Sequence, residues 1–323
     1  MKLSVLSSGL LAAAVLAAAP ATGFAQTFPN KTVKLLSGAS AGSASDIVAR
    51  AVAEKLQAEL GVAVVVENKV GASGTIAAQA LLAAPPDGHT IFVYTAAHTV
   101  TPLISKVPYD ALRDFAAVTP LAVVPNVMVV APSKGYKTVK DVIDAAKAKP
   151  GALNYASVGA GTATYMNAEK FRIATGINAV HVPYKGSPEA ITETIAGRID
   201  YFFAPLVSAL PMIKSGKLIA LAVGTEKRSA QLPEVPTLAE AGVPKSEYVV
   251  WVGMLVHAKT PRAIVQRINQ ATLKALQAPE VRERFASLGA EAMPLSPEQF
   301  DAMIRDEISA NAEILKAAGV KQE

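Results

Sequence analysis

Short apolar runs alternate with amphipathic stretches along most of the chain. Residues 32–37 (TVKLLS), 62–67 (VAVVVE) and 90–95 (TIFVYT) are compact apolar segments, which are typical of buried strands. Residues 47–60 instead carry apolar side chains four positions apart, which predicts an amphipathic helix ended by Gly61; the stripe comprises Val48, Val52, Leu56 and Leu60. The first region is therefore predicted to alternate strand, loop and helix.

The same order recurs in the second part of the chain. Thr138 and Asp141 have the spacing of a helix cap, as do Ser43 and Asp46 in the first part and Ser296 and Gln299 near the end. Ser187 opens a further helix, and apolar segments typical of strands lie at 152–157, 177–182 and 199–203. Two successive strand–loop–helix regions predict an α/β protein with two βαβ sheets, whose ligand loops gather at the carboxyl ends of the parallel strands.

The C-terminal part is again helical, with starts at Pro261 and Pro297. A helical run of this length is expected to pack back on an earlier lobe. We therefore predict a discontinuous first domain, residues 26–125 plus 225–323, and a second domain, residues 126–224. The two crossing segments are expected near Pro125 and Gly224.

The N-terminus has the pattern of a secretory signal peptide. Lys2 precedes the apolar run LLAAAVLAAAP, and small residues surround the end of GFAQ. The run is shorter than the roughly 20 residues that a membrane span needs. We predict a signal peptide over residues 1–25, with cleavage before Gln26 or alternatively before Thr22, and a periplasmic location.

Composition narrows the functional classes. The chain has no cysteine, which excludes disulfides and thiolate metal sites. Its formal net charge of +5 comes from interspersed charges rather than from a basic block with aromatic residues, so nucleic acid is not an expected partner. The histidines lack the spacing of metal ligands, and no cofactor is expected.

Glycine- and serine-rich loops precede a helix in each predicted lobe. Unpaired amide groups and the helix dipole favour an anion at such a position. Candidate donors in these loops are Ser40, Gly42, Ser43, Gly159, Gly161 and Thr162. The alternative is that these residues only permit tight turns and cap the helices.

Two segments partly match motifs of enzymes or nucleotide-binding proteins. Residues 38–42 match G-x-S-x-G, the nucleophile elbow of hydrolases, with Ser40 as nucleophile and His181 or His257 as partner. Only a short mature segment precedes Ser40, however, and it contains no oxyanion motif. Gly159, Gly161 and Thr164 fall one residue short of a dinucleotide fingerprint. A hydrolase is kept as the least favoured alternative.

Several ordered segments resemble one family over essentially the whole mature chain. They are VVVENKVGASG, APPDGHT, VPYDALRDFAAV, VPNVMVV, HVPYKGSPEAITETIAGRID, SALPMIKSGKLIALAV and LPEVPTLAEAGVP. The chain thereby resembles the extracytoplasmic receptors of tripartite tricarboxylate transporters, the Bug or TctC family. The resemblance implies a two-lobed periplasmic binding protein of the venus-flytrap, type II-like kind, with two crossing segments. It implies capture of carboxylates for a membrane permease, without cofactor or catalysis.

The chain departs from that family at the presumed pocket. The first loop keeps Asp46 but lacks the family's prolines, and the second-lobe loop keeps Gly161 and Thr162 but has Tyr165 where the family has histidine. Ala204 and Pro205 stand where relatives have aspartate and asparagine. Because an aspartate could pair with a ligand ammonium group, we expect a carboxylate without an amino group, with an aromatic or apolar body.

We predict that the ligand lies between loops 37–46, 95–99, 157–165 and 203–206. The predicted binding residues are Ser40, Gly42, Ser43, Ser45, Asp46, Thr95, Ser157, Gly159, Gly161, Thr162, Tyr165, Tyr184, Ala204 and Pro205. Asp46 is expected to cap its helix or order a water rather than contact the anion. The predicted partners are a small carboxylate and the permease subunits, with the chain a monomer. The same clamshell could instead serve a periplasmic sensor that signals to a membrane kinase.

Overall fold

Strands from both ends of the chain form the first of two sheets. In the computed structural model, which describes residues 28–248 and 250–317, this sheet has the order β11-β4-β10-β3-β1-β2. Its strands are β1 (Val33–Ser37), β2 (Val64–Asn68), β3 (Thr90–Thr95), β4 (Phe115–Val123), β10 (Trp251–His257) and β11 (Glu291–Ala292). β1 pairs in parallel with β2 and β3, whereas β10 runs antiparallel between β3 and β4.

Helices cover both faces of this sheet. The helices are α1 (Ala44–Leu60), α2 (Thr75–Ala83), α3 (Ala97–Ile104), α8 (Arg262–Gln277), α9 (Pro279–Leu288) and α10 (Pro297–Ala317), with a short 3-10 turn, η1 (Ala72–Gly74). Ile91 and Val93 of β3 pack with α1 and α8, while Phe92 and Tyr94 pack with α2 and α10 on the other face. Burial of both faces explains why these strands read as continuous apolar runs.

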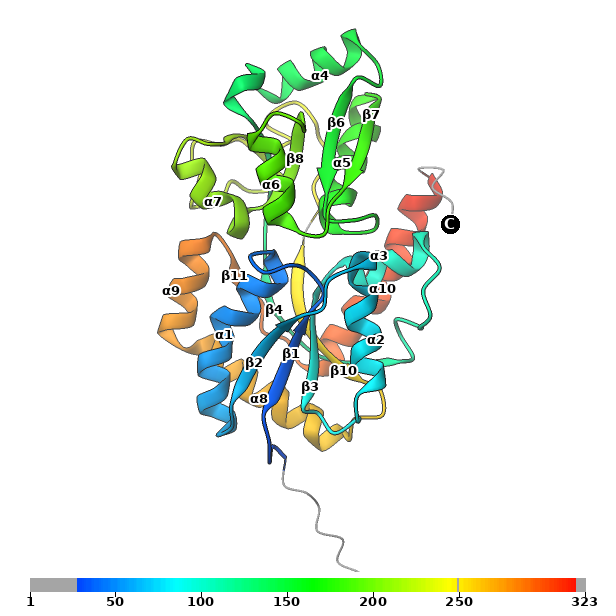
Figure 1. Cartoon of the computed structure of the whole chain (residues 1–323), viewed down its shortest axis with the longest axis vertical. Helices are drawn as coiled ribbons and strands as arrows, with labels where there is room; N and C mark the ends of the chain where they lie inside the picture. Colours follow the sequence, from blue (N-terminus) through cyan, green and yellow to red (C-terminus); the bar gives the residue numbers. More distant parts are fainter. Residues whose placement is uncertain (1–27, 249, 318–323) are drawn as a thin grey trace, which may run out of the picture.

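The second sheet comes from the middle of the chain and has the order β7-β6-β8-β5-β9. Its strands are β5 (Asn126–Val130), β6 (Leu153–Ser157), β7 (Ala179–Pro183), β8 (Tyr201–Pro205) and β9 (Ile219–Val223). Its helices are α4 (Val139–Ala148), α5 (Ala163–Thr175), α6 (Ser187–Ile195) and α7 (Leu206–Lys214), with the 3-10 turn η2 (Pro132–Lys134). Figure 1 shows this lobe stacked above the first.

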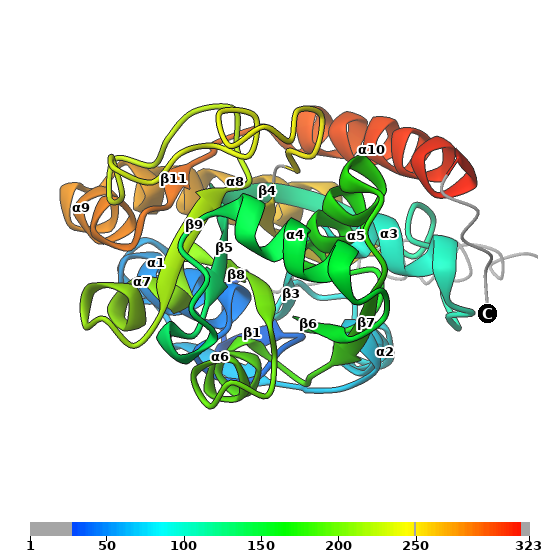
Figure 2. The ribbon, with the colours of Figure 1, turned by 90° about the horizontal axis from the view of Figure 1, so that it is seen from above.

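Two chain segments connect the lobes. One runs from β4 to β5, and the other leads from β9 back to β10. They are joined by hydrogen bonds from Val124 N to Val250 O (2.7 Å) and from Gly224 N to Asn126 O (2.8 Å). Before the return, Leu238 and Val243 pack in the core of the second lobe, and Figure 2 shows this segment along the same side of the molecule as α10. The domain division predicted above stays a prediction.

The helix caps divide into two kinds. Thr138 and Asp141 form the predicted capping box at α4, and Ser296 and Gln299 exchange the same pair of bonds at α10. The box predicted at Ser43 and Asp46 is wrong. Ser43 Oγ accepts a hydrogen bond from Ser187 N of the other lobe, and Asp46 binds the amide of Gly42 instead.

The signal peptide predicted over residues 1–25 lies outside the described residues. Within residues 28–248 and 250–317, no helix combines the length and apolar character that crossing a membrane would require.

Candidate functional site

A cavity of about 660 Å³ lies between the two lobes. It is bounded by the loops that lead into α1, α2 and α3 on one side and into α5, α6 and α7 on the other. These loops follow the carboxyl ends of the parallel strands, where α/β proteins bind ligands. The lining residues include Gly38, Ser43, Ser45, Ser73, Tyr94, Thr95, Asn126, Val158, Gly159, Thr162, Thr164, His181, Tyr184, Lys185, Ser187, Glu189, Pro205 and Val250.

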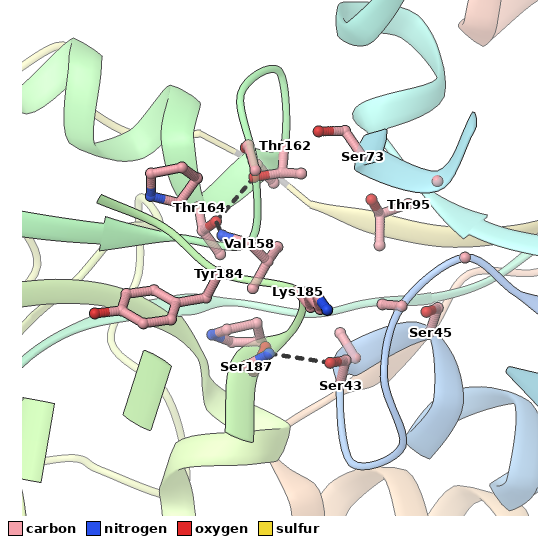
Figure 3. A pocket seen from close by; sticks show the side chains of 18 of the residues that line it. Ser43, Ser45, Ser73, Thr95, Val158, Thr162, Thr164, Tyr184, Lys185 and Ser187 are labelled. Atoms are coloured by element: carbon pink, nitrogen blue, oxygen red, sulfur yellow. Dashed lines mark hydrogen bonds between the residues drawn. The ribbon is translucent and has the colours of Figure 1, made fainter. Parts of the chain in front are cut away.

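The cavity includes half of the predicted binding residues. Those that line it are Ser43, Ser45, Thr95, Gly159, Thr162, Tyr184 and Pro205. Those that do not are Ser40, Gly42, Asp46, Ser157, Gly161, Tyr165 and Ala204. Figure 3 shows the two lobes facing each other across the space, with Ser45, Ser73 and Thr95 on one side and Val158, Thr162 and Thr164 on the other.

Asp46 organises the first loop from behind. Its carboxylate accepts hydrogen bonds from Gly42 N (2.9 Å), Arg50 Nε (2.9 Å) and Asn68 Nδ2 (3.0 Å), and Asn68 also donates to Ala39 O (2.9 Å). Burial alone would raise the pKa of Asp46, but these donors outweigh burial and lower it. Asp46 is therefore an ionised anchor of the loop that binds Gly42 instead of capping α1 as expected, and its role toward the ligand stays a prediction.

The loop before α2 also lines the cavity, although the sequence analysis names no candidate in it. Gly71, Ala72, Ser73 and Gly74 all have positive φ, at 135°, 45°, 47° and 85°. Two non-glycine residues in this region make a strained backbone, which is a recurrent feature of functional loops. Tyr94 OH donates to Ser73 O (2.5 Å) and holds the turn. This run of positive φ marks the loop as unusual, and it includes two residue types, Ala and Ser, whose sequence does not predict it.

At the start of α5 the hydroxyl groups hold the loop itself. Thr162 Oγ1 donates to Gly159 O (2.7 Å) and lies 2.9 Å from Thr164 Oγ1, which accepts from Val158 N (3.0 Å). Thr162 also accepts the amide of Tyr165 as the N-cap. These two hydroxyls are thus already engaged within their own loop.

His181 lies in the wall of the cavity as a neutral group. Its Nε2 is 2.6 Å from Ser157 Oγ, and its ring packs between Tyr155 (5.1 Å between centroids) and Tyr165 (5.0 Å). Burial lowers the pKa of His181. Ser157 and Tyr165 therefore support the imidazole from behind instead of lining the cavity.

Ser40 is not hydrogen-bonded to either of the histidines considered as its catalytic base. Its hydroxyl donates to Glu189 Oε2 (3.1 Å) of the other lobe. Of the two histidines considered as its partner, His181 is bonded to Ser157, and His257 accepts the amide of Lys259 at the end of β10. The described residues also contain no cluster of His, Cys, Asp or Glu suited to a metal ion.

The segment from the end of β7 to the first turn of α6 contributes more residues to the cavity than predicted. Tyr184 was expected there, but Pro183, Lys185, Ser187 and Glu189 also line the cavity. Figure 3 shows Lys185 between Val158 and Ser43, whereas the ring of Tyr184 points away from Ser73 and Thr95. The signal available in the sequence was the short PYKG turn between a strand and a helix.

The lobes touch on both sides of the cavity. Ser187 N donates to Ser43 Oγ (3.0 Å), and Ser208 Oγ donates to Gly42 O (2.9 Å). A Cβ on Gly186 would lie 1.9 Å from Ser40 Oγ, and one on Gly159 would lie 2.4 Å from Ser73 Oγ. The structure is thus the closed arrangement, in which glycines allow the loops to meet.

Comparison with known proteins gives consistent matches over most of the chain. Residues 48–320 match the family described as the tripartite tricarboxylate transporter family receptor. The chain is 34% identical over 282 residues to the UPF0065 protein in the tcbD-tcbE intergenic region of Pseudomonas sp. (strain P51), covering 87% of this chain and 84% of that protein. The periplasmic binding protein BugD is 30% identical with a TM-score of 0.88, covering 92% of this chain and 100% of BugD.

A further similar structure is that of a protein with a carboxylate ligand. The R. palustris protein Rpa4515 with adipate is 31% identical and has a TM-score of 0.88, covering 92% of this chain and 100% of that protein. These matches confirm the predicted fold class, a two-lobed α/β periplasmic binding protein.

Proposed function

The chain belongs to the tripartite tricarboxylate transporter family of receptors, and on that premise we propose that it captures a small organic carboxylate between its two lobes. The main support for this proposal is the cavity of about 660 Å³, which is enclosed by loops that lead into helices of both lobes. Amide groups at helix starts bind anions without a metal or cofactor. A relative of similar fold is described with adipate, which supports a carboxylate as the ligand class.

The proposed role is transport from the periplasm. BugD, which shares the fold over its full length, is described as a periplasmic binding protein. The receptor would act as a monomer that hands its ligand to membrane permease subunits. Chemical conversion is not part of the proposal, because Ser40 is bonded to Glu189 and neither candidate histidine is bonded to it.

The ligand is proposed to lack an ammonium group. Pro205 lines the cavity without an amide hydrogen, while Ala204 is fully buried among the aliphatic side chains of the second lobe. Glu189 is the one acidic residue among the described lining residues, and it is exposed to solvent, where an ion pair with a ligand ammonium would contribute little. Among the described lining residues an amino acid would therefore find no buried carboxylate to balance its ammonium charge, whereas Val158, Pro205 and Val250 offer apolar surface to an alkyl chain or a ring.

Thermal denaturation with a panel of carboxylates tests this function. Adipate, succinate, malate, benzoate and phthalate are each compared with aspartate and glutamate. A ligand at about 100 times its dissociation constant adds about 2.7 kcal/mol, or roughly 5–10 °C in melting temperature. We expect at least one simple carboxylate to give such a shift and the amino acids to give less. Absence of any shift, together with no small carboxylate in protein purified from the periplasm, would contradict the proposal.

A further inference from the structure

We propose that Glu307 couples ligand capture to proton uptake: closing of the lobes favours its protonated carboxyl, so a carboxylate ligand binds more tightly in slightly acidic than in slightly alkaline solution. The inference concerns a side chain of the first lobe beside the second crossing segment, outside the ligand cavity. It goes beyond the proposed function and rests on it only because a ligand is needed to close the lobes.

Glu307 lies on α10, next to the point where the second crossing segment enters β10. Its Oε2 accepts the indole hydrogen of Trp251, the first residue of β10, at 2.7 Å. The carbonyl oxygen of Trp251 accepts the amide of Ala96 (3.2 Å), just before α3. Val250, which precedes Trp251, lines the ligand cavity. One hydrogen bond therefore connects the carboxyl to the residue that follows the cavity wall.

Side chains of the second lobe close over the same region. Ala163 and Met166 of α5 belong to one apolar cluster with Tyr248 and Trp251 of the first lobe and its crossing segment. The ammonium of Lys170, also on α5, lies 5.9 Å from the centre of the Tyr248 ring. Figure 1 shows α5 above α3 and α10. These contacts exist only while the lobes are closed, so closure removes water from this region.

No positive charge balances the carboxyl of Glu307. Among the described residues it has a hydrogen bond from Trp251 but no ion pair. Burial disfavours an ionised carboxyl that lacks a counter-ion, and it raises the pKa of Glu307 to about 7 despite the bond from Trp251. Glu307 also lines a cavity of about 670 Å³ beside α10, through which a proton can reach it.

The elements around Glu307 carry other titratable groups, which are Asp306 on α10, Glu247 and Tyr248 on the crossing segment, Lys170 on α5 and His98 on α3. Burial raises the pKa of Tyr248, as does the charge of Glu307, and burial lowers the pKa of His98 to about 4. Both are therefore neutral near neutral pH. Burial also lowers the pKa of Lys170, which donates a hydrogen bond to Glu247 O, so the test must change Glu307 alone.

Opening of the lobes would separate α5 from Tyr248 and admit water beside Glu307. Water stabilises the ionised carboxylate, so the pKa of Glu307 is expected to be lower in the open state than in the closed state. Closure, and with it ligand binding, then takes up part of a proton at any pH between these two values. Ligand affinity is highest below that range, falls as the pH rises through it, and is constant above it.

The fluorescence of Trp251 reports on this carboxyl directly, because the chain has one tryptophan and its indole N–H is bonded to Glu307. The full mature chain is titrated from about pH 5 to pH 9, alone and with adipate or benzoate, and both affinities are measured by calorimetry over the same range. Glu307→Gln removes the charge and keeps an oxygen that can accept the indole hydrogen. The matched control is Glu313→Gln, an exposed residue of the same helix.

The parent chain and Glu313→Gln should show a fluorescence transition near neutral pH that moves upward when ligand binds. It should be absent from Glu307→Gln. Affinity of the parent chain for the better carboxylate should fall about 3–10-fold between about pH 6 and pH 8, whereas in Glu307→Gln it should stay near the acid value of the parent. Titration of the ligand itself is the same in every variant and cancels in this comparison.

Absence of the transition, a transition that bound ligand does not move, or a parent-like pH dependence of affinity in Glu307→Gln would overturn the inference. A loss of affinity in Glu307→Gln that is equal at every pH would also overturn it, because it would show a structural role. If neither carboxylate binds the parent chain at any pH, the proposed function fails, and the coupling fails with it.

Discussion

The two sides of the cleft close by different means. On the α1–α6 side, polar groups meet: Ser43 with Ser187, Ser40 with Glu189, and Gly42 with Ser208. Gly186 also allows a close approach on this side, since a Cβ on it would lie 1.9 Å from Ser40 Oγ, an atom that a side-chain rotation can move. On the α5 side, the glycines lie against backbone as well as side-chain atoms. A Cβ on Gly161 would lie 2.9 Å from Thr101 Cα, and one on Gly159 would meet Ser73 Oγ.

The two sides therefore contribute differently to closure: one through hydrogen bonds and the other through close packing. The contacts on the α1–α6 side are directional hydrogen bonds, so a substitution there removes one bond and leaves the others in place. The α5 side depends on the absence of side chains, so it sets how closely the lobes approach whatever the ligand is. Changes on the α5 side should therefore abolish closure, whereas changes on the α1–α6 side should weaken or redirect binding.

The largest effect is expected from Gly161→Ala. Its Cβ would meet the backbone of Thr101, which cannot rotate aside as a side chain could. Carboxylate affinity should fall at least about a hundredfold by calorimetry, because the closed state is blocked. Gly176→Ala is the matched control. That glycine has a similar φ of 68°, against 78° for Gly161, but nothing within 4 Å of its Cβ. Equal affinities in the two variants would contradict a steric role for the α5 side.

A second effect concerns the anchor of the α1 loop. Asp46→Asn loses charge-assisted bonds to Gly42, Arg50 and Asn68, so the free energy of unfolding should fall by about 1–3 kcal/mol at neutral pH. The pKa of Asp46 is lowered in the folded chain, so its contribution is present above the unfolded pKa and disappears as pH falls through the folded value.

Denaturant titration of both proteins at neutral pH and near pH 3 measures this difference. The gap between Asp46→Asn and the parent chain should narrow in acid. A gap that stays constant with pH would show that the ionised carboxylate is not what holds the loop.

Ser43→Ala should have a smaller effect, confined to the closed state. It leaves the amide of Ser187 without its acceptor on the opposite lobe. Affinity for adipate or benzoate should fall about tenfold, while the melting temperature without ligand stays near that of the parent. Ser215→Ala, an exposed serine bonded within its own lobe, serves as control. An unchanged affinity would mean that this hydrogen bond does not contribute to closure.

The smallest effect is expected from Ser40→Ala. Its bond to Glu189 is solvent-exposed, and exposed polar contacts to charged groups contribute little. Affinity should change less than about threefold. The same substitution tests the hydrolase alternative, since Ser40 was its nucleophile. Covalent labelling by a fluorophosphonate in the parent chain but not in Ser40→Ala would contradict the role of a binding protein.

The sequence predicted most of the scaffold because its signals are local. Alternating apolar runs and amphipathic stretches gave the strands and helices, and two capping boxes formed as expected at Thr138 and Ser296. The box at Ser43 failed because its hydroxyl bonds a residue 144 positions away in the other lobe. Such a contact depends on how the lobes close, which no local pattern encodes.

The site was predicted at the level of loops and less well at the level of side chains. Successive side chains of a strand point to opposite faces of the sheet, so Phe203 and Ala204 are buried in different hydrophobic clusters of the second lobe. Ala204 therefore does not line the cavity. The ring of Tyr165 packs against the ring of His181, with 5.0 Å between their centroids. Lys185 and Ser187 were missed because their place in the cavity wall depends on how the two lobes face each other, and the PYKG turn marks only the loop that carries them.

A crystal structure of the chain with adipate or benzoate bound tests the central claim most directly. The account predicts the ligand enclosed in the cavity between the lobes, in contact with loops of both. The lobes should be joined by the Ser43–Ser187 contact. A carboxylate bound outside this cavity, or held by one lobe with the other turned away from it, would contradict the account.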